Sequence, residues 1–135
     1  MKQGTITGIS GPVIDVHFPE GSLPAINEAL TVEANGTRCT MEVEQHLENK
    51  TVRCVMMAGS DGLSRGLTVT ATGHGISVPV GEATLGRMFN VLGDPIDGEA
   101  PVSADVPRWE IHRPAPGFAQ QPGEHPALIT LLAFT

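Results

Sequence analysis

The residues best suited to catalysis form the run Gly62-Leu63-Ser64-Arg65-Gly66, which matches the G-x-S-x-G motif of serine hydrolases. In those enzymes the serine attacks the substrate from a sharp turn that joins a strand to a helix. Here an Asp61-Gly62 turn pattern precedes Ser64, and an alternating, threonine-rich strand pattern follows it. The sequence therefore predicts a loop at Ser64, and a serine hydrolase is the least favoured of the alternative functions.

Two glycine patterns that could hold phosphate are incomplete. A P-loop needs a lysine directly after a glycine, because that lysine reaches the β- and γ-phosphates. Neither Lys2 nor Lys50 follows a glycine. The run Gly73-His74-Gly75 begins like a dinucleotide-binding fingerprint, but Val78 stands at the place of the third glycine. We predict that this run ends a strand, and that the chain binds no cofactor.

The spacing of the titratable residues favours neither a metal site nor a catalytic pair. Asp94 and Asp97 flank Pro95, and Asp-Pro and Asp-Gly pairs usually form turns. The histidines lack the HxH or HxxxH spacing typical of metal ligands. They are His17, His46, His74, His112 and His125. The sequence therefore predicts no catalytic residue and no metal ligand.

The charge of the chain excludes some partners. The 135 residues include 15 acidic and 8 basic side chains, for a formal net charge of −7. Because the basic residues are scattered, we expect no binding to nucleic acid and no direct adsorption to anionic lipid. No signal or transit pattern precedes the first strand, so a cytoplasmic protein is expected.

The two cysteines, Cys39 and Cys54, are not arranged in a CxxC motif. A hairpin turning near Asn49 would place Cys39 opposite the region of Gly59 rather than opposite Cys54. We therefore predict two buried free thiols and no disulfide.

Residues 5–80 alternate apolar and polar side chains, which is typical of half-buried antiparallel strands. Asn35-Gly36 favours a tight type I′ hairpin turn. In the strand that follows, Glu42 and Glu44 are predicted to face outward, and the inward face is predicted to hold Cys39, Met41, Val43, Gln45 and Leu47. Residues 51–57 are apolar on both faces, so both faces should be covered. About six strands, the last at 76–80, predict an all-β fold: a small closed six-stranded antiparallel barrel.

The periodicity changes after Gly81. Leu85, Met88, Phe89 and Leu92 have helical spacing, but a short helix that ends at Gly86, with a strand at 87–92, fits nearly as well. Residues 101–116 are rich in proline, which predicts an extended connector. The sequence thus divides into a barrel domain at 1–80, a junction with an incomplete second domain at 81–121, and a divergent tail at 122–135.

The junction residues are specific enough to indicate a family. The run GEATLGRMFNVLGDPIDG, followed by PRWEIHRPAPGF, resembles the catalytic beta subunit of rotary F-type ATP synthases, as do GTITGISGPVIDVHF and TGHGISVPVG upstream. The alpha subunit shares the run at 84–97 in looser form, whereas Asn90 and residues 111–116 favour beta. The junction residues that match the family motif are Leu85, Gly86, Arg87, Asn90, Val91, Gly93, Pro95, Ile96, Asp97, His112, Arg113 and Pro114.

The resemblance implies a six-stranded N-terminal barrel, one of the barrels that form a crown on a ring of alternating alpha and beta subunits. It implies the alpha subunit and neighbouring subunits of the soluble ring as partners, and Mg-ATP or Mg-ADP as ligands of the full-length proteins. Those proteins perform proton-driven ATP synthesis at the inner face of an energy-coupling membrane, which they contact through the complex. Their nucleotide-binding domain begins near Arg87 and Asn90, and its P-loop, general base and metal ligands follow the connector.

The tail at 122–135 departs from the family, and we expect the chain to be truncated before the P-loop. No catalytic residue is therefore carried over, and the chain alone is expected to be inactive. A structural and assembly role is the favoured function. A stand-alone barrel that binds a small ligand is an alternative, although roughly eight strands are needed to enclose one. The uncharged apolar run at 127–134 should promote aggregation unless something covers it.

Overall fold

The computed structural model describes residues 2–21, 23–58 and 61–120. The chain divides into two compact units, the first ending at Ile76 and the second beginning at Ser77, a few residues before the boundary placed at 80 from the sequence. In the described ranges, no helix is long and apolar enough to cross a membrane. The predicted tail lies outside the described residues.

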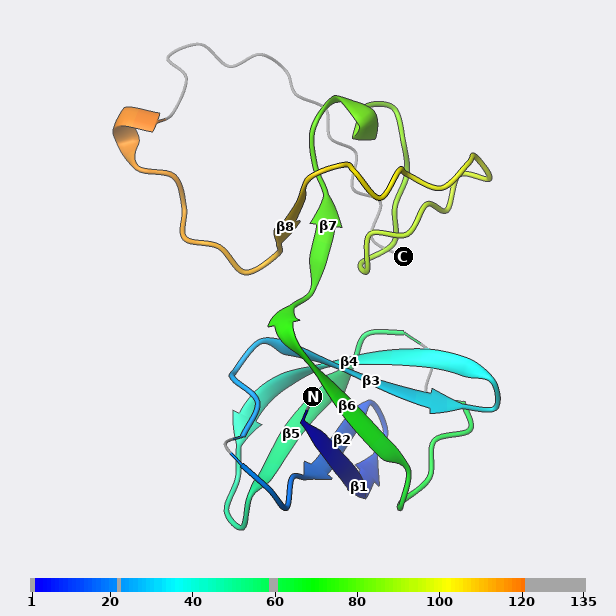
Figure 1. The fold of residues 1–135 in the computed structure, drawn as a ribbon, viewed down its shortest axis with the longest axis vertical. Coiled ribbons are helices and arrows are strands. Elements are labelled where there is room, and N and C mark those ends of the chain that lie inside the picture. The colour runs from blue at the N-terminus through cyan, green and yellow to red at the C-terminus, as the bar shows by residue number, and fades with distance from the viewer. Residues whose placement is uncertain (1, 22, 59–60, 121–135) are drawn as a thin grey trace. The chain divides into compact units, whose positions relative to one another are not determined.

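The first unit is a closed barrel, which confirms the predicted fold class (Figure 1). The strands follow the order β1-β2-β5-β4-β3-β6, and each neighbouring pair is antiparallel. Closure pairs β1 with β6, so the sheet has no open edge. The strands are β1 (Gln3–Ser10), β2 (Val13–His17), β3 (Glu28–Ala34), β4 (Thr37–His46), β5 (Thr51–Met56) and β6 (Thr68–Gly75).

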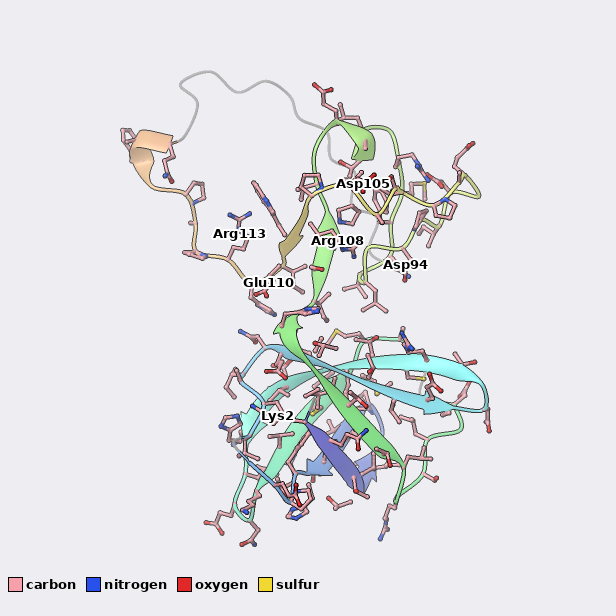
Figure 2. All side chains as sticks on the ribbon, viewed as in Figure 1. Lys2, Asp94, Asp105, Arg108, Glu110 and Arg113 are labelled. Atoms are coloured by element: carbon pink, nitrogen blue, oxygen red, sulfur yellow. The ribbon has the colours of Figure 1, made fainter. Side chains whose placement is uncertain are left out.

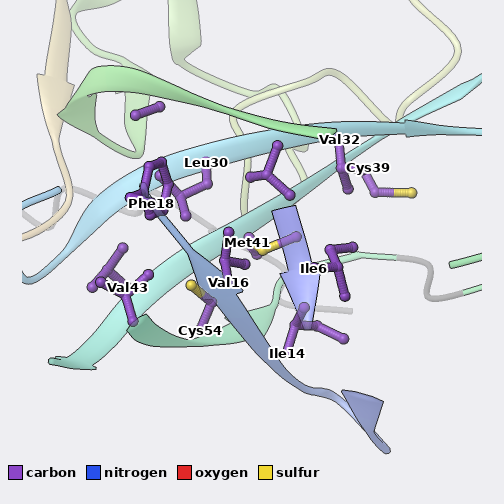
Figure 3. Close-up of a cluster of buried hydrophobic side chains, with 13 residues drawn as sticks. Ile6, Ile14, Val16, Phe18, Leu30, Val32, Cys39, Met41, Val43 and Cys54 are labelled. Atoms are coloured by element: carbon purple, nitrogen blue, oxygen red, sulfur yellow. The ribbon is translucent and has the colours of Figure 1, made fainter. Parts of the chain in front are cut away.

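The interior of the barrel is filled by apolar side chains from all six strands (Figure 3). Phe18, which directly follows β2, is fully buried and is the largest of them. The interior is thus occupied by side chains, as is usual for small barrels. The core residues are Ile6, Ile14, Val16, Phe18, Leu30, Val32, Cys39, Met41, Val43, Val52, Cys54, Val69 and Ala71.

Both cysteines are buried and free, as predicted. Cys39 lies opposite Val32 of β3, and Cys54 lies opposite Val43 of β4. The two thiols thus lie in different strand pairs, and each acts as a small apolar side chain in the core.

The tight turn between β3 and β4 is also confirmed. Asn35 and Gly36 have φ values of 51° and 76°, the left-handed conformation that a type I′ turn requires at both central positions. The turn sets the register that pairs Ala34 with Thr37 and buries Leu30 opposite Met41.

The second half of β4 departs from the predicted alternation. Gln45 was expected to face inward, but it is exposed. The register between β4 and β5 shifts between Val43 and Gln45. This bulge reverses the inward and outward alternation of side chains at the end of β4. Glu42 was expected on the solvent side, but it is buried. Both expectations were wrong. The bulge accounts for Gln45 alone, because Glu42 precedes it and keeps the regular register opposite Val55.

The outer face of β5 is less covered than its composition suggested. Val55 and Met57 are only half-buried, so the prediction that both faces are covered was wrong for the outer face. In β5, apolar residues on both faces of the strand therefore did not predict burial of both faces.

The glycines at the end of β6 do not end the strand, contrary to the prediction. The strand continues through Gly73 to Gly75, and its register against β3 shifts between Glu28 and Leu30. The expected last barrel strand at 76–80 was also wrong. Residues Ser77–Pro79 (β7) pair instead with Arg108–Glu110 (β8) in a separate two-stranded sheet.

Substitution of Gly4 should destabilise the barrel. Gly4 is buried in β1, and an added Cβ would lie 2.8 Å from the main-chain oxygen of His17 and 2.9 Å from Val16 Cγ1. Since the backbone cannot yield easily, we expect Gly4→Ala to lower the free energy of unfolding by about 1–3 kcal/mol in urea denaturation. Gly8→Ala in the same strand is the control, because its Cβ would meet Asp15 at an ordinary 3.6 Å. An equal loss in both variants would contradict the steric explanation.

The second unit is built on the β7–β8 ribbon and contains two single-turn 3₁₀ helices, Glu82–Thr84 and Phe118–Gln120. The helical spacing from Leu85 to Leu92 does not produce a helix, because Leu85 is already extended after the first 3₁₀ turn. The alternative strand at 87–92 is reduced to a single bridge from Phe89 to Pro95. The proline-rich connector is not extended throughout, because it turns at residues 104–105, where the N–H of Val106 donates to the carbonyl oxygen of Ser103. It is extended in β8.

Candidate functional site

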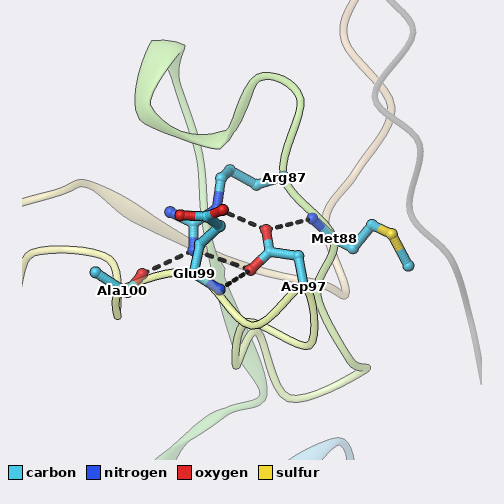
Figure 4. A network of polar contacts seen from close by, with 5 residues as sticks. All are labelled: Arg87, Met88, Asp97, Glu99 and Ala100. Atoms are coloured by element: carbon cyan, nitrogen blue, oxygen red, sulfur yellow. Dashed lines mark hydrogen bonds and ion pairs between the residues drawn. The ribbon is translucent and has the colours of Figure 1, made fainter.

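The junction loop of the second unit is closed by an ion pair between Arg87 and Asp97 (Figure 4). Arg87 Nε donates a hydrogen bond to Asp97 Oδ2 at 2.7 Å, and Arg87 Nη2 donates to Asp97 Oδ1 at 3.3 Å. Arg87 Nη2 also donates to the carbonyl oxygen of Ala100 at 2.7 Å. The two-point contact fixes the orientation of both side chains, so the pair acts as a clip across the loop.

Asp97 is an anion at neutral pH. The hydrogen bond from the Arg87 guanidinium keeps the pKa of the Asp97 carboxyl well below its ordinary value, and desolvation opposes this shift without cancelling it. The main-chain N–H groups of Glu99 and Met88 add to the effect, donating to the carboxylate at 3.0 and 3.2 Å. The hydrogen bond that Arg87 donates to Asp97 also raises the pKa of Arg87. Since a general acid or base needs a pKa near the working pH, Asp97 has a structural role.

The two sides of the loop pair behind this clip. Phe89 is buried and forms a bridge with Pro95, and the N–H of Ile96 donates to the carbonyl oxygen of Met88 at 2.9 Å. The guanidinium of Arg87 lies 5.9 Å from the centre of the Phe89 ring, within the range of a cation–π contact. The loop is therefore a very short hairpin with one buried aromatic ring.

Asn90 forms the tip of this hairpin. Its side-chain oxygen accepts hydrogen bonds from the main-chain N–H groups of Leu92 at 3.0 Å and Asp94 at 2.9 Å. Its main-chain N–H donates to the carbonyl oxygen of Asp94, also at 2.9 Å. An asparagine side chain that bonds the backbone in this way replaces part of a turn, so Asn90 is a turn-forming residue.

Gly93 allows the hairpin to pack closely on β7. Its φ is 81°, and an added Cβ would lie 2.8 Å from Pro79 Cδ and 3.1 Å from Val78 Cα. Both the conformation and the space therefore require glycine at this position.

Arg108 of β8 joins the ribbon to the hairpin (Figure 2). Its Nε donates to Ser77 Oγ at 3.2 Å, and its Nη2 donates to the carbonyl oxygens of Ser77 at 2.7 Å and Leu92 at 3.3 Å. The sequence analysis missed Arg108, because its partners are 16 and 31 residues away and no local pattern predicts them.

The structure thus gathers part of the predicted motif and leaves part outside it. The clustered residues are Arg87, Asn90, Gly93, Pro95, Ile96 and Asp97. Those that take no part in the hydrogen bonds described above are Leu85, Gly86, Val91, His112, Arg113 and Pro114. Among these, the Arg113 guanidinium lies 3.7 Å from the centre of the Trp109 ring. A shared function of the motif residues stays a prediction.

Ser64 lies in an exposed loop, as predicted. The segment after it leads through a turn into β6 rather than into a helix. The strand–turn–helix context of a nucleophile elbow is therefore missing around Ser64.

The described residues do not fit a magnesium–nucleotide site. In residues 2–21, 23–58 and 61–120, no group of three or more His, Cys, Asp or Glu side chains could hold a metal ion. The best-placed carboxylate, Asp97, already has Arg87 and two main-chain N–H groups as its partners.

The Arg87–Asp97 clip should open only in acid. The pKa of Asp97 is lower in the folded loop than the ordinary carboxyl value of 3.8, so the ion pair stabilises the loop fully above that pH. Its contribution is lost as the pH falls below 3.8 toward the folded pKa. We expect the amide NMR signals of Met88 and Glu99 to shift in this range, and to shift already at neutral pH in Asp97→Asn.

Asp105→Asn is the matched control for this measurement, because it removes an equal charge from an exposed position in the same unit. It should leave the Met88 and Glu99 signals in place. A transition of the wild-type signals near neutral pH would contradict the proposed geometry.

The family of the chain follows from its barrel. The ATP synthase alpha/beta family, beta-barrel domain, matches residues 6–73, which is half of the 135 residues. The match begins in β1 and ends in β6, so it covers β2 to β5 in full and most of β1 and β6. The chain belongs to the ATP synthase alpha/beta family, and its first unit is the N-terminal beta-barrel domain of that family.

Proposed function

We propose that this chain is the N-terminal part of an ATP synthase beta subunit, with a structural and assembly role in the alternating alpha–beta ring. The observation that carries the proposal is the family match over a closed six-stranded barrel whose interior is fully packed. Such a unit offers a rigid outer surface to neighbouring subunits. We therefore assign ATP synthesis and hydrolysis to parts of the full-length protein other than the barrel.

Assignment to beta rather than alpha rests on the junction. Asn90 and the run Ile111-His112-Arg113-Pro114-Ala115-Pro116 favour beta in the sequence. Asn90 also has a definite structural task, because its side chain forms the hairpin tip. Because Asn90 is needed to form the turn, its match to the beta subunit is better evidence of relationship than a match at an exposed residue without a structural role.

Lateral association would use the polar outer faces of the barrel strands. A shallow groove crosses β3, β4 and β6 and is lined mainly by polar side chains, among them Thr31, Thr68, Thr70, Thr72 and His74. Polar surfaces of this kind suit subunits that meet through hydrogen bonds and bound water. We propose the alpha-subunit barrel as the partner, and the inner face of an energy-coupling membrane as the place of assembly, reached through the complex.

Binding to an alpha-subunit barrel tests this role. Purified chain and an isolated alpha barrel should form a complex at high micromolar concentration, measured by sedimentation velocity. Thr70→Arg should weaken the complex because it adds a long charged side chain to the polar groove, whereas Ser10→Arg, at the exposed end of β1, should not. Failure of the unmodified chain to bind would exclude the assembly role for this chain.

Titration with Mg-ATP tests the expected lack of activity. We expect no saturable heat in isothermal titration calorimetry up to millimolar ligand, because the sequence has no Gly-Lys-Ser/Thr run to hold the phosphates. A saturable heat would require a nucleotide site that is built differently from the family's site.

A further inference from the structure

The second unit carries an apolar groove beside its ribbon. The groove has a volume of about 750 Å³ and is lined by residues of β7, the first 3₁₀ turn and β8. Two of its large side chains, Leu85 and Trp109, are each 55% exposed. Glu82 is the one charged residue in the lining, so the groove lacks the convergent polar groups of a small-molecule site. Its surface suits an apolar polypeptide segment.

The chain itself supplies such a segment. Residues 127–134 read Ala-Leu-Ile-Thr-Leu-Leu-Ala-Phe, with no charge and a single polar side chain. We propose that this segment packs into the β7–β8 groove and covers Leu85 and Trp109. The proposal goes beyond the assembly role, since it concerns a contact within the second unit.

The connection is long enough for this contact. Trp109 lies in the groove, and residue 127 follows it by 18 positions. A connection of that length reaches up to about 60 Å when extended, so the chain can turn back to the ribbon. A tethered segment also has an effective concentration of the order of millimolar at its own groove, without any new contact being needed to attract it.

Charge favours this occupant over a second copy of the chain. Residues 77–120 hold six acidic and three basic side chains, and the whole chain has a net charge of −7. Two copies would therefore bring like charges together, which opposes association. The segment at 127–134 adds no charge to the groove.

Trp109 is the only tryptophan of the chain, so its fluorescence reports on the groove directly. In the unmodified chain we expect acrylamide to quench Trp109 weakly and to the same extent at all protein concentrations. The double variant Ile129→Asp/Leu131→Asp should raise the quenching constant by about twofold, because a docked apolar segment covers the exposed half of the indole. Leu85→Asp, on the groove side, should raise it similarly.

Ile26→Asp is the matched control for Leu85→Asp, because Ile26 is 48% exposed and belongs to the barrel. It should leave the quenching constant unchanged. Equal quenching in the unmodified chain and the double variant would overturn the proposal, as would an equal rise in Ile26→Asp. Protection of Trp109 that is lost on dilution would show a second copy in the groove and would also overturn it. None of these results depends on binding to an alpha subunit.

Discussion

Phe18→Ala should lower the free energy of unfolding of the barrel by about 3–5 kcal/mol, the usual cost of removing a buried aromatic ring. Phe18 is fully buried, and it is the single aromatic residue among residues 1–76. The surrounding Val, Ile, Leu and Met side chains belong to a closed sheet, which limits how far they can collapse into the cavity. Small domains have a total stability of about 5–15 kcal/mol, so the variant should lie near the limit of folding.

Urea denaturation followed by far-UV circular dichroism measures this loss. Phe118→Ala is the control, since it removes the same ring from a position that is 92% exposed. That variant should change the free energy of unfolding by less than about 0.5 kcal/mol. A loss below about 1 kcal/mol in Phe18→Ala would mean that the barrel core is loosely packed, contrary to the structure.

The second large effect is a loss of stability in alkali that depends on Cys54. Burial raises the pKa of the Cys54 thiol to about 12 from an ordinary value of 9.0, and the carboxylates of Asp15 and Glu44 contribute. The folded state therefore keeps the thiol proton at a pH where the unfolded chain has lost it. The stability from this group is fully present below pH 9.0 and is lost as the pH rises toward 12, by up to about 1.4 kcal/mol for each pH unit.

Chemical denaturation at a series of pH values should show this slope in the unmodified chain and a flatter slope in Cys54→Ala. The difference in slope isolates the thiol from other groups that titrate in alkali. A second measurement uses a Cys39→Ala background, in which Cys54 is the sole thiol. Ellman's reagent should then react much more slowly with folded than with urea-unfolded chain at pH 8. Equal rates would show that Cys54 is accessible in the folded state.

The junction illustrates how the same residues can satisfy two incompatible patterns. Leu85, Met88, Phe89 and Leu92 have helical spacing, yet they form a short hairpin after one 3₁₀ turn. The hairpin is favoured because Asn90 and Gly93 supply the turn and Asp97 brings Arg87 across it. The spacing of the apolar residues could not predict that Asp97, ten residues after Arg87, closes the loop.

The sequence by itself determined the all-β class, the Asn35-Gly36 turn and the two buried thiols. These features follow from short-range patterns, because side chains alternate every second residue in a strand and a tight turn needs particular residues. The junction motif also indicated the family, which the match to the barrel then established at the level of the alpha/beta family.

Only the tertiary structure decided where the alternation fails and which distant segments meet. The bulges near Gln45 and Gly73 arise when a strand is fitted to both of its neighbours in a closed sheet, so they depend on residues far away in the sequence. The pairing of β7 with β8 and the contacts of Arg108 likewise join segments about 30 residues apart. Strand partners are chosen by the packing of the whole unit, and that information is not present in any local stretch of the chain.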